Sequence, residues 1–528
     1  MSIAPSTTII LYKNVPLDNT YKHTLYFHSV PAQNSYFNNL SKLSISPNTY
    51  QRVNKGVFRI GQPANVMYAY NYLSFTNNNT EYEQKRFYAF ITKVEYVNDS
   101  VCDIFYEIDV MQTWLPNIHY NLGSQFVERE HSVTDNAGEN IVPEPVELGE
   151  YVMDNYETLL DLSDCCVIVG TIDNDTSLQF PIVGYMYDNI YSSCRLHNFT
   201  CDVTGYDALG NFISNHQDPD NEIKFMYIAP QALFTAITQG IIPNFKTSVV
   251  NTASGSALDD EAVFNDSASS SGYSPDNKKL YTYPYNFYSV DNSCGDNIVL
   301  RYEFFTNFTP SFNIKGTFVQ PVKVTCYPAH YKGISNVDYK ESVSIDSFPQ
   351  ASWSNDYYAR WLAQDSVASA LSMLGNVGIG AAVGGAVGAG ASLASGLLSL
   401  GASAYKASLH ADIVKGKTTS NVLIANGQLK FRGCRTHITK DMCKVIDNFF
   451  TRFGYATNEL KEPNISSRPH WNYIKTRDCT INCYQSNIPN EFTKQINANF
   501  DNGITFWKSS GASDNQNVGN YLLNNKPT

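Results

Sequence analysis

The amino-acid sequence predicts a mainly β protein that carries one α-helical, apolar, glycine-rich hairpin late in the chain. The first observation is composition: of 528 residues, 13% are aromatic and only 16% are charged. Tyr and Phe favour pleated, half-buried surfaces. The second is period-two alternation in the first third of the chain, and the third is an uncharged stretch at residues 366–405. At this length we expect about three or four folding units, built as several barrel-like or sandwich-like modules.

The clearest strand pair is predicted between residues 87 and 110. Its second half alternates apolar with polar or aromatic positions: Ile104, Tyr106, Ile108 and Val110 against Asp103, Phe105, Glu107 and Asp109. A short Asn/Asp/Ser segment at 98–100 separates it from the apolar run at 87–97. This pattern predicts a β-hairpin with one face in water. Glu107 and Asp109 are expected on the solvated face, and Leu115-Pro116 is expected to end the second strand.

The middle of the chain, from residue 159 to the 340s, contains many short apolar runs. Cys166-Val167-Ile168-Val169 and Ile298-Val299-Leu300 are examples, and turn residues separate them. Such spacing favours barrels or sandwiches over βαβ units. Residues 251–279 interrupt the runs with Ser, Asp, Asn and Gly, which predicts a flexible surface loop. Its acidic cluster, Asp259, Asp260 and Glu261, could bind calcium, but the spacing matches no EF-hand loop, and a solvated loop is favoured.

Residues 366–405 contain no Asp, Glu, Lys, Arg or His. As a single helix they would span about 60 Å, roughly twice the ~30 Å hydrocarbon core of a bilayer. Folded as a hairpin, each arm would just cross it. Two sets of large residues fall at i, i+4 and i+7 and mark one face of each arm: Val367, Leu371 and Leu374, then Leu393, Leu397 and Leu400.

Glycines fill the centre of this stretch and favour a bend there. Gly380, Gly384 and Gly388 are also spaced by four, which in an apolar setting forms a groove for a second helix. Only about a dozen residues of the stretch are large, so a lone copy should be a marginal span, and several packed copies should insert better. We therefore expect conditional, oligomeric membrane insertion. The alternative is a helical hairpin buried in a globular domain.

The net charge and the lack of catalytic motifs argue against two functional classes, nucleic-acid-binding proteins and enzymes. The net charge is −12 and no basic run occurs, which is unlike a nucleic-acid reader. An acidic surface would suit a conduit that DNA passes without sticking, although ordinary solubility explains the same charge. The motifs of serine hydrolases, zinc proteases and phosphate loops are missing. His131 between Glu130 and Ser132 is a weak catalytic signal, so we expect neither catalysis nor a cofactor.

The first residues and the 11 cysteines together indicate a chain made in a reducing cytosol. Residues 1–6 show no basic region followed by an apolar one, so no secretion signal is expected. The cysteines are then expected to be reduced and buried. Cys434 and Cys443 are nine apart and Cys479 and Cys483 four apart, which fits no zinc knuckle, so no metal site is expected.

Four segments together carry a family resemblance. They are Tyr21-Lys22-His23-Thr24-Leu25-Tyr26-Phe27, Phe87-Tyr88-Ala89-Phe90, the stretch from Phe105 to Trp114 with Glu107-Ile108-Asp109-Val110-Met111-Gln112-Thr113-Trp114, and Val127-Glu128-Arg129-Glu130-His131. In this order they resemble the amino-terminal part of the tail knob (distal tail tube, or major tail) proteins of small short-tailed, protein-primed bacteriophages. The resemblance covers about the first 130 residues. Members of that family also carry a long hydrophobic loop late in the chain, where residues 366–405 lie here.

The resemblance implies a virion protein at the tail tip. Six subunits would form a hollow tube, associated with other phage tail proteins, whose loops plug its end and later form a channel in the host cell membrane for genomic DNA. We expect an amino-terminal β tube domain (1–150), middle β modules (151–350), an apolar membrane-active loop (361–415) and a carboxy-terminal segment returning to the β tube (416–528). The alternatives are a tail-associated cell-wall hydrolase and a passive adhesin.

Overall fold

The chain folds into two compact units, and each draws on separate parts of the sequence. Unit 1 comprises residues 1–149, 273–280 and 440–528, and unit 2 comprises 150–272 and 281–439. The structure is a computed structural model that describes residues 7–76, 85–119, 122–171, 185–187, 190–192, 194–215, 223–233, 240–241, 249–258, 263–264, 272–317, 322–333, 340–346, 348, 350–352, 429–481, 488–509 and 517–527. Both units are built mainly from strands, so the predicted mainly β class is confirmed. The predicted helical hairpin falls outside the described residues.

The first layer of unit 1 is a seven-stranded antiparallel sheet. Its strands, in spatial order, are β3 (Lys42–Ile45), β1 (Ile9–Tyr12), β6 (Tyr72–Thr76), β7 (Arg86–Asn98), β8 (Val101–Ile108), β5 (Val57–Ile60) and β4 (Tyr50–Asn54). The short helix α2 (Ala64–Met67) and the inner faces of these strands form one apolar core, which includes Leu11, Phe58 and Ile104. Period-two burial of this kind is expected for a sheet with one wet face.

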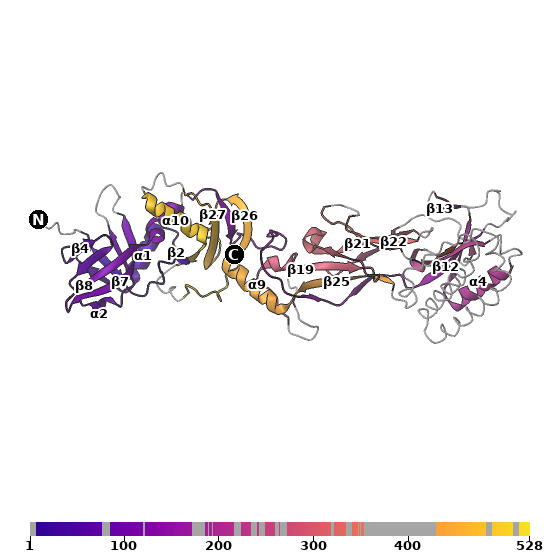
Figure 1. Cartoon of the computed structure of the whole chain (residues 1–528), viewed down its shortest axis with the longest axis horizontal. Helices are drawn as coiled ribbons and strands as arrows, with labels where there is room; N and C mark the ends of the chain where they lie inside the picture. Colours follow the sequence, from indigo (N-terminus) through magenta and orange to yellow (C-terminus); the bar gives the residue numbers. More distant parts are fainter. Residues whose placement is uncertain are drawn as a thin grey trace, which may run out of the picture. The chain divides into compact units, whose positions relative to one another are not determined.

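The second sheet of unit 1 joins the two ends of the chain. Its order is β2 (His23–Tyr26), β28 (Ile504–Lys508), β27 (Trp471–Arg477), β9 (Gln125–Glu130) and β26 (Tyr455–Lys461), and only β2 and β28 pair in parallel. The colours of Figure 1 show carboxy-terminal strands β26 and β27 and amino-terminal strand β2 in the same region. The helices of the unit are α1 (Val30–Asn39), α3 (Val110–His119), α9 (Lys440–Phe453) and α10 (Asn490–Asn502).

Aromatic side chains fill a core of unit 1 to which both sheets contribute. Phe37 of α1 stacks on Tyr72 at 5.7 Å between ring centroids and lies 4.5 Å from Tyr88. Trp471 and Trp507 are 2% exposed or less and lie 4.9 Å apart. Aromatic pairs at these separations add to the free energy of burial. Many of the aromatic residues of the sequence therefore lie in the core of unit 1.

The predicted hairpin between residues 87 and 110 is confirmed, with two corrections. β7 and β8 pair antiparallel across the turn at Asp99-Ser100, and Glu107 is exposed as expected. However, β8 ends at Ile108 and α3 follows, so the prediction that Leu115-Pro116 ends the strand is wrong. The solvated position predicted for Asp109 is also wrong, because Asp109 is buried at the start of α3.

Asp109 is buried because it caps the first turn of α3. Its carboxylate accepts the backbone N–H of Gln112 at 3.0 Å and the Tyr72 hydroxyl at 2.8 Å. An aspartate before a helix satisfies N–H groups that have no intrahelical partner. Burial, partly offset by these hydrogen bonds, raises the pKa of Asp109 to about 7.

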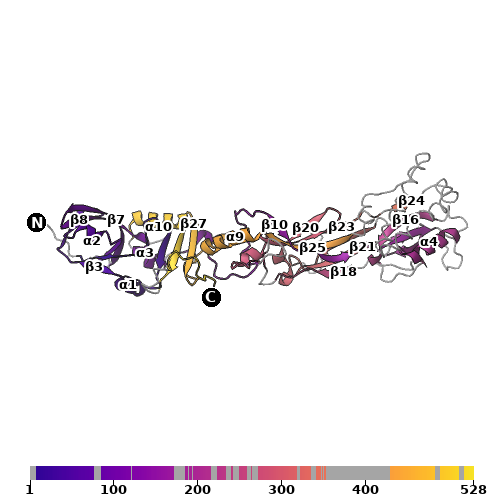
Figure 2. The same ribbon diagram turned by 90° about the horizontal axis from the view of Figure 1, so that it is seen from below.

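Unit 2 contains further antiparallel sheets around one large core. The first joins β10 (Tyr151–Met153) and β11 (Glu157–Asp161) to β25 (Lys430–Ile438), which pairs with β19 (Asn286–Asp291), and β19 pairs in turn with β20 (Asn297–Leu300). Figure 2 shows β10, β20 and β25 in one region. The second is β17 (Gly240–Ile241), β15 (Arg195–Thr200), β12 (Cys165–Thr171), β16 (Ile223–Pro230) and β24 (Gln350–Ser352). The third is β18 (Val249–Ser254), β21 (Ser311–Thr317), β22 (Lys323–Pro328) and β23 (Val343–Ile345), and β13 (Tyr185–Tyr187) pairs with β14 (Ile190–Ser192).

The strands predicted from short apolar runs are confirmed. The run at 166–169 lies in β12, which is buried along its whole length, and the run at 298–300 lies in β20. The helix α4 (Val203–Asn215) follows β15, and 3₁₀ turns are η2 (Gln231–Leu233), η3 (Lys278–Tyr281), η4 (Tyr302–Phe304) and η5 (Thr306–Phe308). Of the range 251–279, the described residues include the end of β18 and the segment from Tyr273 to Lys279.

Two further properties concern cysteines and membrane helices. Ten cysteines lie in the described ranges, no disulfide joins them there, and all but Cys294 are buried. Among the helices of the described segments, none combines the length and the apolar character that a bilayer-spanning helix needs.

Candidate functional site

The nine residues predicted to act in the membrane lie outside the described residues. They are Val367, Leu371, Leu374, Gly380, Gly384, Gly388, Leu393, Leu397 and Leu400, and the acidic cluster Asp259, Asp260 and Glu261 is likewise not described. The strands that flank residues 353–428 are described, and both belong to unit 2. β24 ends at Ser352 and pairs with β16, whereas β25 begins at Lys430 and lies between β10, β11 and β19.

The residues that directly follow 353–428 are buried in the core of unit 2. Leu429 and Phe431 are fully buried. The Leu162 N–H donates to the Leu429 carbonyl at 2.8 Å, and β25 then pairs with β19 over six residues. The residues that directly follow 353–428 are therefore fixed in the core of unit 2 by burial and by backbone hydrogen bonds.

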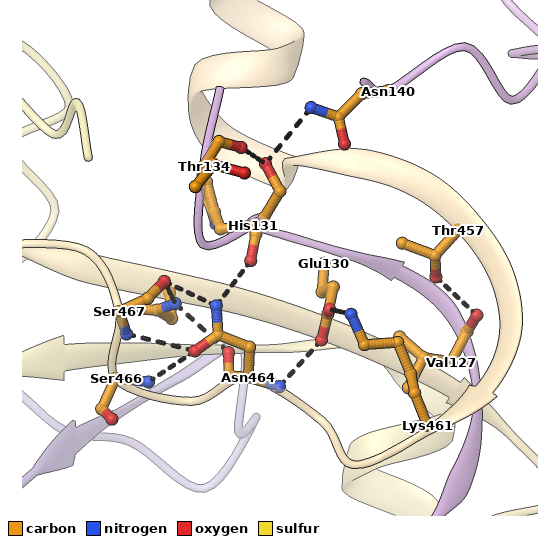
Figure 3. Close-up of polar contacts among 12 residues, drawn as sticks. Val127, Glu130, His131, Thr134, Asn140, Thr457, Lys461, Asn464, Ser466 and Ser467 are labelled. Carbon is orange, nitrogen blue, oxygen red and sulfur yellow. Dashed lines mark hydrogen bonds and ion pairs between the residues drawn. The ribbon is translucent and has the colours of Figure 1, made fainter. Parts of the chain in front are cut away.

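The described residues also contain a buried polar site, which lies in unit 1. Its first part, here called the polar junction, consists of Glu130, His131, Lys461 and Asn464 (Figure 3). The Asn464 N–H donates to Glu130 Oε2 at 2.8 Å, and Asn464 Nδ2 donates to the His131 carbonyl at 2.9 Å. Glu130 is fully buried and its Oε1 pairs with Lys461 Nζ at 2.5 Å. These contacts fasten the loop after β26 to the end of β9.

His131 has both ring nitrogens occupied by backbone groups. Nδ1 accepts the Tyr473 N–H at 2.8 Å, which requires that Nε2 carries the proton and donates to the Thr451 carbonyl at 3.1 Å. Burial, together with the charges of Arg468 and Arg129, lowers the pKa of His131 to about 3. The imidazole is therefore neutral and structural, and neither nitrogen is available to act as a general base.

A cavity of about 420 Å³ lies next to the polar junction. Its lining includes His131, Asp135, Asp447, Arg468 and residues 521–526. Arg468 is only 4% exposed, its Nη1 and Nη2 reach Asn525 O and Ser132 Oγ at 3.4 Å each, and its Nε has no hydrogen-bond partner. Burial lowers the pKa of Arg468, because a desolvated cation is disfavoured.

Asp447 of α9 lines this cavity and binds the segment 273–277. Its Oδ2 accepts the Tyr273 hydroxyl at 2.5 Å and the Asp276 N–H at 2.9 Å. Its Oδ1 accepts the Asn277 N–H at 3.0 Å and Asn277 Nδ2 at 2.7 Å. Four donors satisfy this carboxylate although it is 2% exposed, as a buried charge requires.

A buried ion cluster holds the same segment from the other side. The Glu144 carboxylate is fully buried, contacts the Arg129 guanidinium, and accepts from Lys279 Nζ at 2.7 Å. Lys279 Nζ also donates to the Val142 carbonyl at 2.7 Å, and the Ala456 N–H donates to Glu144 at 2.8 Å. Residues 273–280 thus belong firmly to unit 1, although the chain before and after them belongs to unit 2.

Sequence reasoning missed Asp447 and Arg468, although a signal existed for the first. Cys443, Ile446, Asp447 and Phe450 follow the spacing of one helix face, which places a carboxylate inside an apolar stripe. Arg468 lies in a loop and offers no such pattern. Among the described residues, no group of His, Cys, Asp and Glu side chains is arranged to hold a metal ion.

Comparisons with known proteins identify matching family models, related sequences and a solved structure with the same fold. A family model described as the C-terminal domain of the Bacillus phage phi29 tail knob protein gp9 matches residues 243–526, and one described as the N-terminus of a caudoviral major tail protein matches residues 5–119. The chain is 25% identical to the tail knob protein gp9 of Bacillus phage B103 and 26% identical to that of phi29, with 98% of both chains covered in each case. The solved structure of the bacteriophage C1 tail knob protein gp12 shares the fold, with a TM-score of 0.63 at 15% identity, over 99% of this chain and 100% of that one.

Proposed function

We propose, since this chain belongs to the family of the phi29 tail knob protein gp9, that it forms an oligomeric conduit for DNA whose apolar loops enter the host membrane. The chain is a structural component of a phage tail and of the virion, and its relatives are named for that role rather than for an enzymatic activity. The proposal comprises three further points: the apolar loops insert into the host membrane, they form a channel there, and the assembly is a hexamer.

The observation that carries the proposal is the absence of charge in residues 366–405. A charged residue at the centre of a membrane helix costs about 2.5 to 3.5 kcal/mol, so forty positions without one suit contact with lipid. The many Ala, Gly and Ser residues add little to insertion but allow close helix packing. Insertion would therefore need several copies together, and backbone groups would be satisfied among helices rather than by lipid.

The position of this segment between two strands supports the same role. The segment follows β24 in the sequence and precedes Leu429, which is buried in the core of unit 2. An inserting segment needs a fixed base, because otherwise its insertion would unfold the domain that carries it. The hydrogen bond from Leu162 to Leu429 and the long β25 strand provide that base.

The charge distribution supports a DNA conduit. Unit 2 contains 15 Lys and Arg residues against 26 Asp and Glu residues, a net charge of −11, whereas unit 1 is nearly balanced with 22 against 23. Nonspecific DNA binding depends on neutralisation of phosphates by Lys and Arg. A unit with this excess of carboxylates repels DNA and would let it pass without adhering.

A phage that lacks residues 370–402 tests the proposal. We expect assembled particles that adsorb normally but deliver no genome, measured as phage DNA inside the cell. A variant with Leu393→Lys and Leu397→Lys should show the same defect without a deletion, because two buried charges oppose insertion by about 5 to 7 kcal/mol in total. The control is Leu393→Ile with Leu397→Ile, which keeps the apolar surface. Normal infectivity of the deletion phage would refute the role.

A further inference from the structure

Unit 1 contains a second cavity, and its lining is basic. Its volume of about 710 Å³ falls within the range of roughly 300 to 1,000 Å³ that is typical of small-molecule sites. Its walls come from the end of β2, from α1, from the loop before β27, from the end of β28 and from residues 517–518, all within unit 1. Three basic residues, His28, His470 and Lys508, line it, and the described lining contains no Asp or Glu. The cavity is therefore a basic site in a chain whose net charge is −12.

Strand pairing places two of these basic side chains next to each other. In the register of β27 and β28, Trp471 lies opposite Trp507. His470 and Lys508 are the next opposite pair, and the Lys508 N–H donates to the His470 carbonyl at 2.8 Å. Side chains that are opposite on antiparallel strands share one face of the sheet, with Cβ atoms about 5 Å apart, and like charges in this position are destabilising. A bound anion would offset that repulsion.

The ammonium group of Lys508 has no counter-charge within the part of the chain that the structure describes. It forms no ion pair, hydrogen bond or cation–π contact there, and partial burial lowers the pKa of Lys508 because a desolvated cation is disfavoured. By contrast Lys475, which is also half-buried, pairs with Glu128 at 2.7 Å. Lys508 is half-buried rather than enclosed, so an anion in the cavity could supply the missing partner.

Neutral groups of the lining also favour an anion. Ser35 and Ser466 line the cavity, and neither hydroxyl has a hydrogen-bond partner among the described residues. The first turn of α1 borders the cavity at Ala32 and carries no acidic residue, and a helix dipole is positive at this end. The ammonium, the imidazoles and the hydroxyls thus offer donors from separate segments, which suits a group with three acceptor oxygens such as phosphate.

The lining favours a phosphate over a carboxylate. Lysine binds phosphate as a point charge, whereas a planar carboxylate is matched best by the fork of an arginine, and no arginine is in the described lining. The cavity is also much larger than a phosphate ion. Tyr26, Ala32 and Val518 line it as well, so an organic group attached to the phosphate would have apolar surface to contact.

We propose that this cavity binds the phosphate monoester of a small organic molecule. Lys508 pairs with the phosphate, and the imidazoles of His28 and His470 and the two serine hydroxyls donate hydrogen bonds to its oxygens. The organic part lies against Tyr26 and Val518. All these residues belong to unit 1, so the proposal does not depend on the membrane role of residues 366–405.

Calorimetric titration of the full-length protein tests this assignment. The probes are glycerol 3-phosphate and glucose 6-phosphate, with glycerol, glucose and acetate as controls, and vesicles that contain an anionic phospholipid distinguish a lipid headgroup from a soluble ester. We expect at least one soluble ester to bind saturably and inorganic phosphate to compete with it, whereas acetate and the neutral compounds should not compete. Equal binding of acetate or of a neutral compound, binding to vesicles alone, or no binding of either ester would overturn the proposal.

Variants locate the binding in this cavity. Lys508→Gln removes the charge but keeps a polar side chain, and affinity for the ester should fall about 10-fold or more, as for hydrogen bonds to charged groups. His28→Gln changes an exposed side chain and should weaken binding roughly 3- to 10-fold without affecting folding. Lys494→Gln, which removes an exposed lysine of α10, is the matched control and should bind as the unaltered protein does. Unchanged affinity in His28→Gln would contradict the assignment even if Lys508→Gln failed to fold.

Discussion

The buried, neutral His131 makes the stability of unit 1 depend on pH. Its pKa is about 3 in the folded protein against an ordinary value of 6.5. Between these values the unfolded chain binds the proton and the folded one does not, so stability is fully present above pH 6.5 and falls as the pH decreases toward 3. From pH 6.5 to pH 5 the loss from this one group is about 2 kcal/mol, at roughly 1.4 kcal/mol per pH unit.

The variant His131→Asn isolates this effect. Asparagine can still accept the Tyr473 N–H but cannot titrate, and it loses the contact with the Thr451 carbonyl. The variant should therefore have a lower free energy of unfolding than the unaltered protein near pH 7. At pH 5 this gap should be about 2 kcal/mol smaller, because only the unaltered protein loses stability through His131. Other titrating groups are common to both proteins and cancel.

Urea unfolding followed by tryptophan fluorescence measures the difference, because Trp114, Trp471 and Trp507 are buried in unit 1. Trp471 is a direct reporter of the site, since its Nε1 donates to the same Thr451 carbonyl at 3.1 Å. If both proteins lose stability equally between pH 7 and pH 5, His131 is not held neutral and the reasoning fails.

Three further substitutions test the packing of unit 1 by urea unfolding. Gly454→Ala should destabilise by more than about 2 kcal/mol, because Gly454 has φ +63° and a Cβ would lie 2.1 Å from the Glu130 carbonyl oxygen; Gly61→Ala, with nothing within 4 Å, is the control, and equal effects would contradict the argument. Glu144→Gln should cost about 3 to 5 kcal/mol because it leaves buried cations without their counter-charge, and a loss below 1 kcal/mol would show that the cluster is weak. Between pH 4 and pH 7 folded Asp109 holds a proton that the unfolded chain has released, so the free energy of unfolding of the unaltered protein falls as the pH rises. Asparagine does not titrate, so the free energy of unfolding of Asp109→Asn should rise relative to the unaltered protein by about 1.4 kcal/mol per pH unit over this range. A difference that does not change with pH would contradict the raised pKa.

Local periodicity predicts β7, β8, β12 and β20, but it does not predict the buried polar groups. Alternation identified β7 and β8, and short apolar runs identified β12 and β20, because burial on one or both faces leaves a direct trace in the sequence. Asp109 was misplaced because alternation was extended one position too far. The aspartate followed three residues later by Gln112 is a helix-start pattern, and this pattern competes with the strand reading at that point.

The pairing of distant segments could not be read from single residues. The second sheet of unit 1 combines β2 and β9 with β26, β27 and β28, which lie more than 300 residues later. The cavity likewise depends on Asp135, Asp447 and Arg468 from three separate parts of the chain. Asp135 and Arg468 show no local sign of a site, and the helical spacing of Asp447 shows only that it is buried, because the groups that satisfy all three come from tertiary contacts.

Contact between residues 366–405 and lipid during infection tests the central claim most directly. Host cells whose membranes contain a photoactivatable lipid would be infected, illuminated at intervals, and the cross-linked peptides of this chain identified. Cross-links within residues 366–405 should appear after adsorption and together with DNA delivery, and they should be lost in the variant with Leu393→Lys and Leu397→Lys. Delivery of DNA with no lipid cross-link to these forty residues would contradict it.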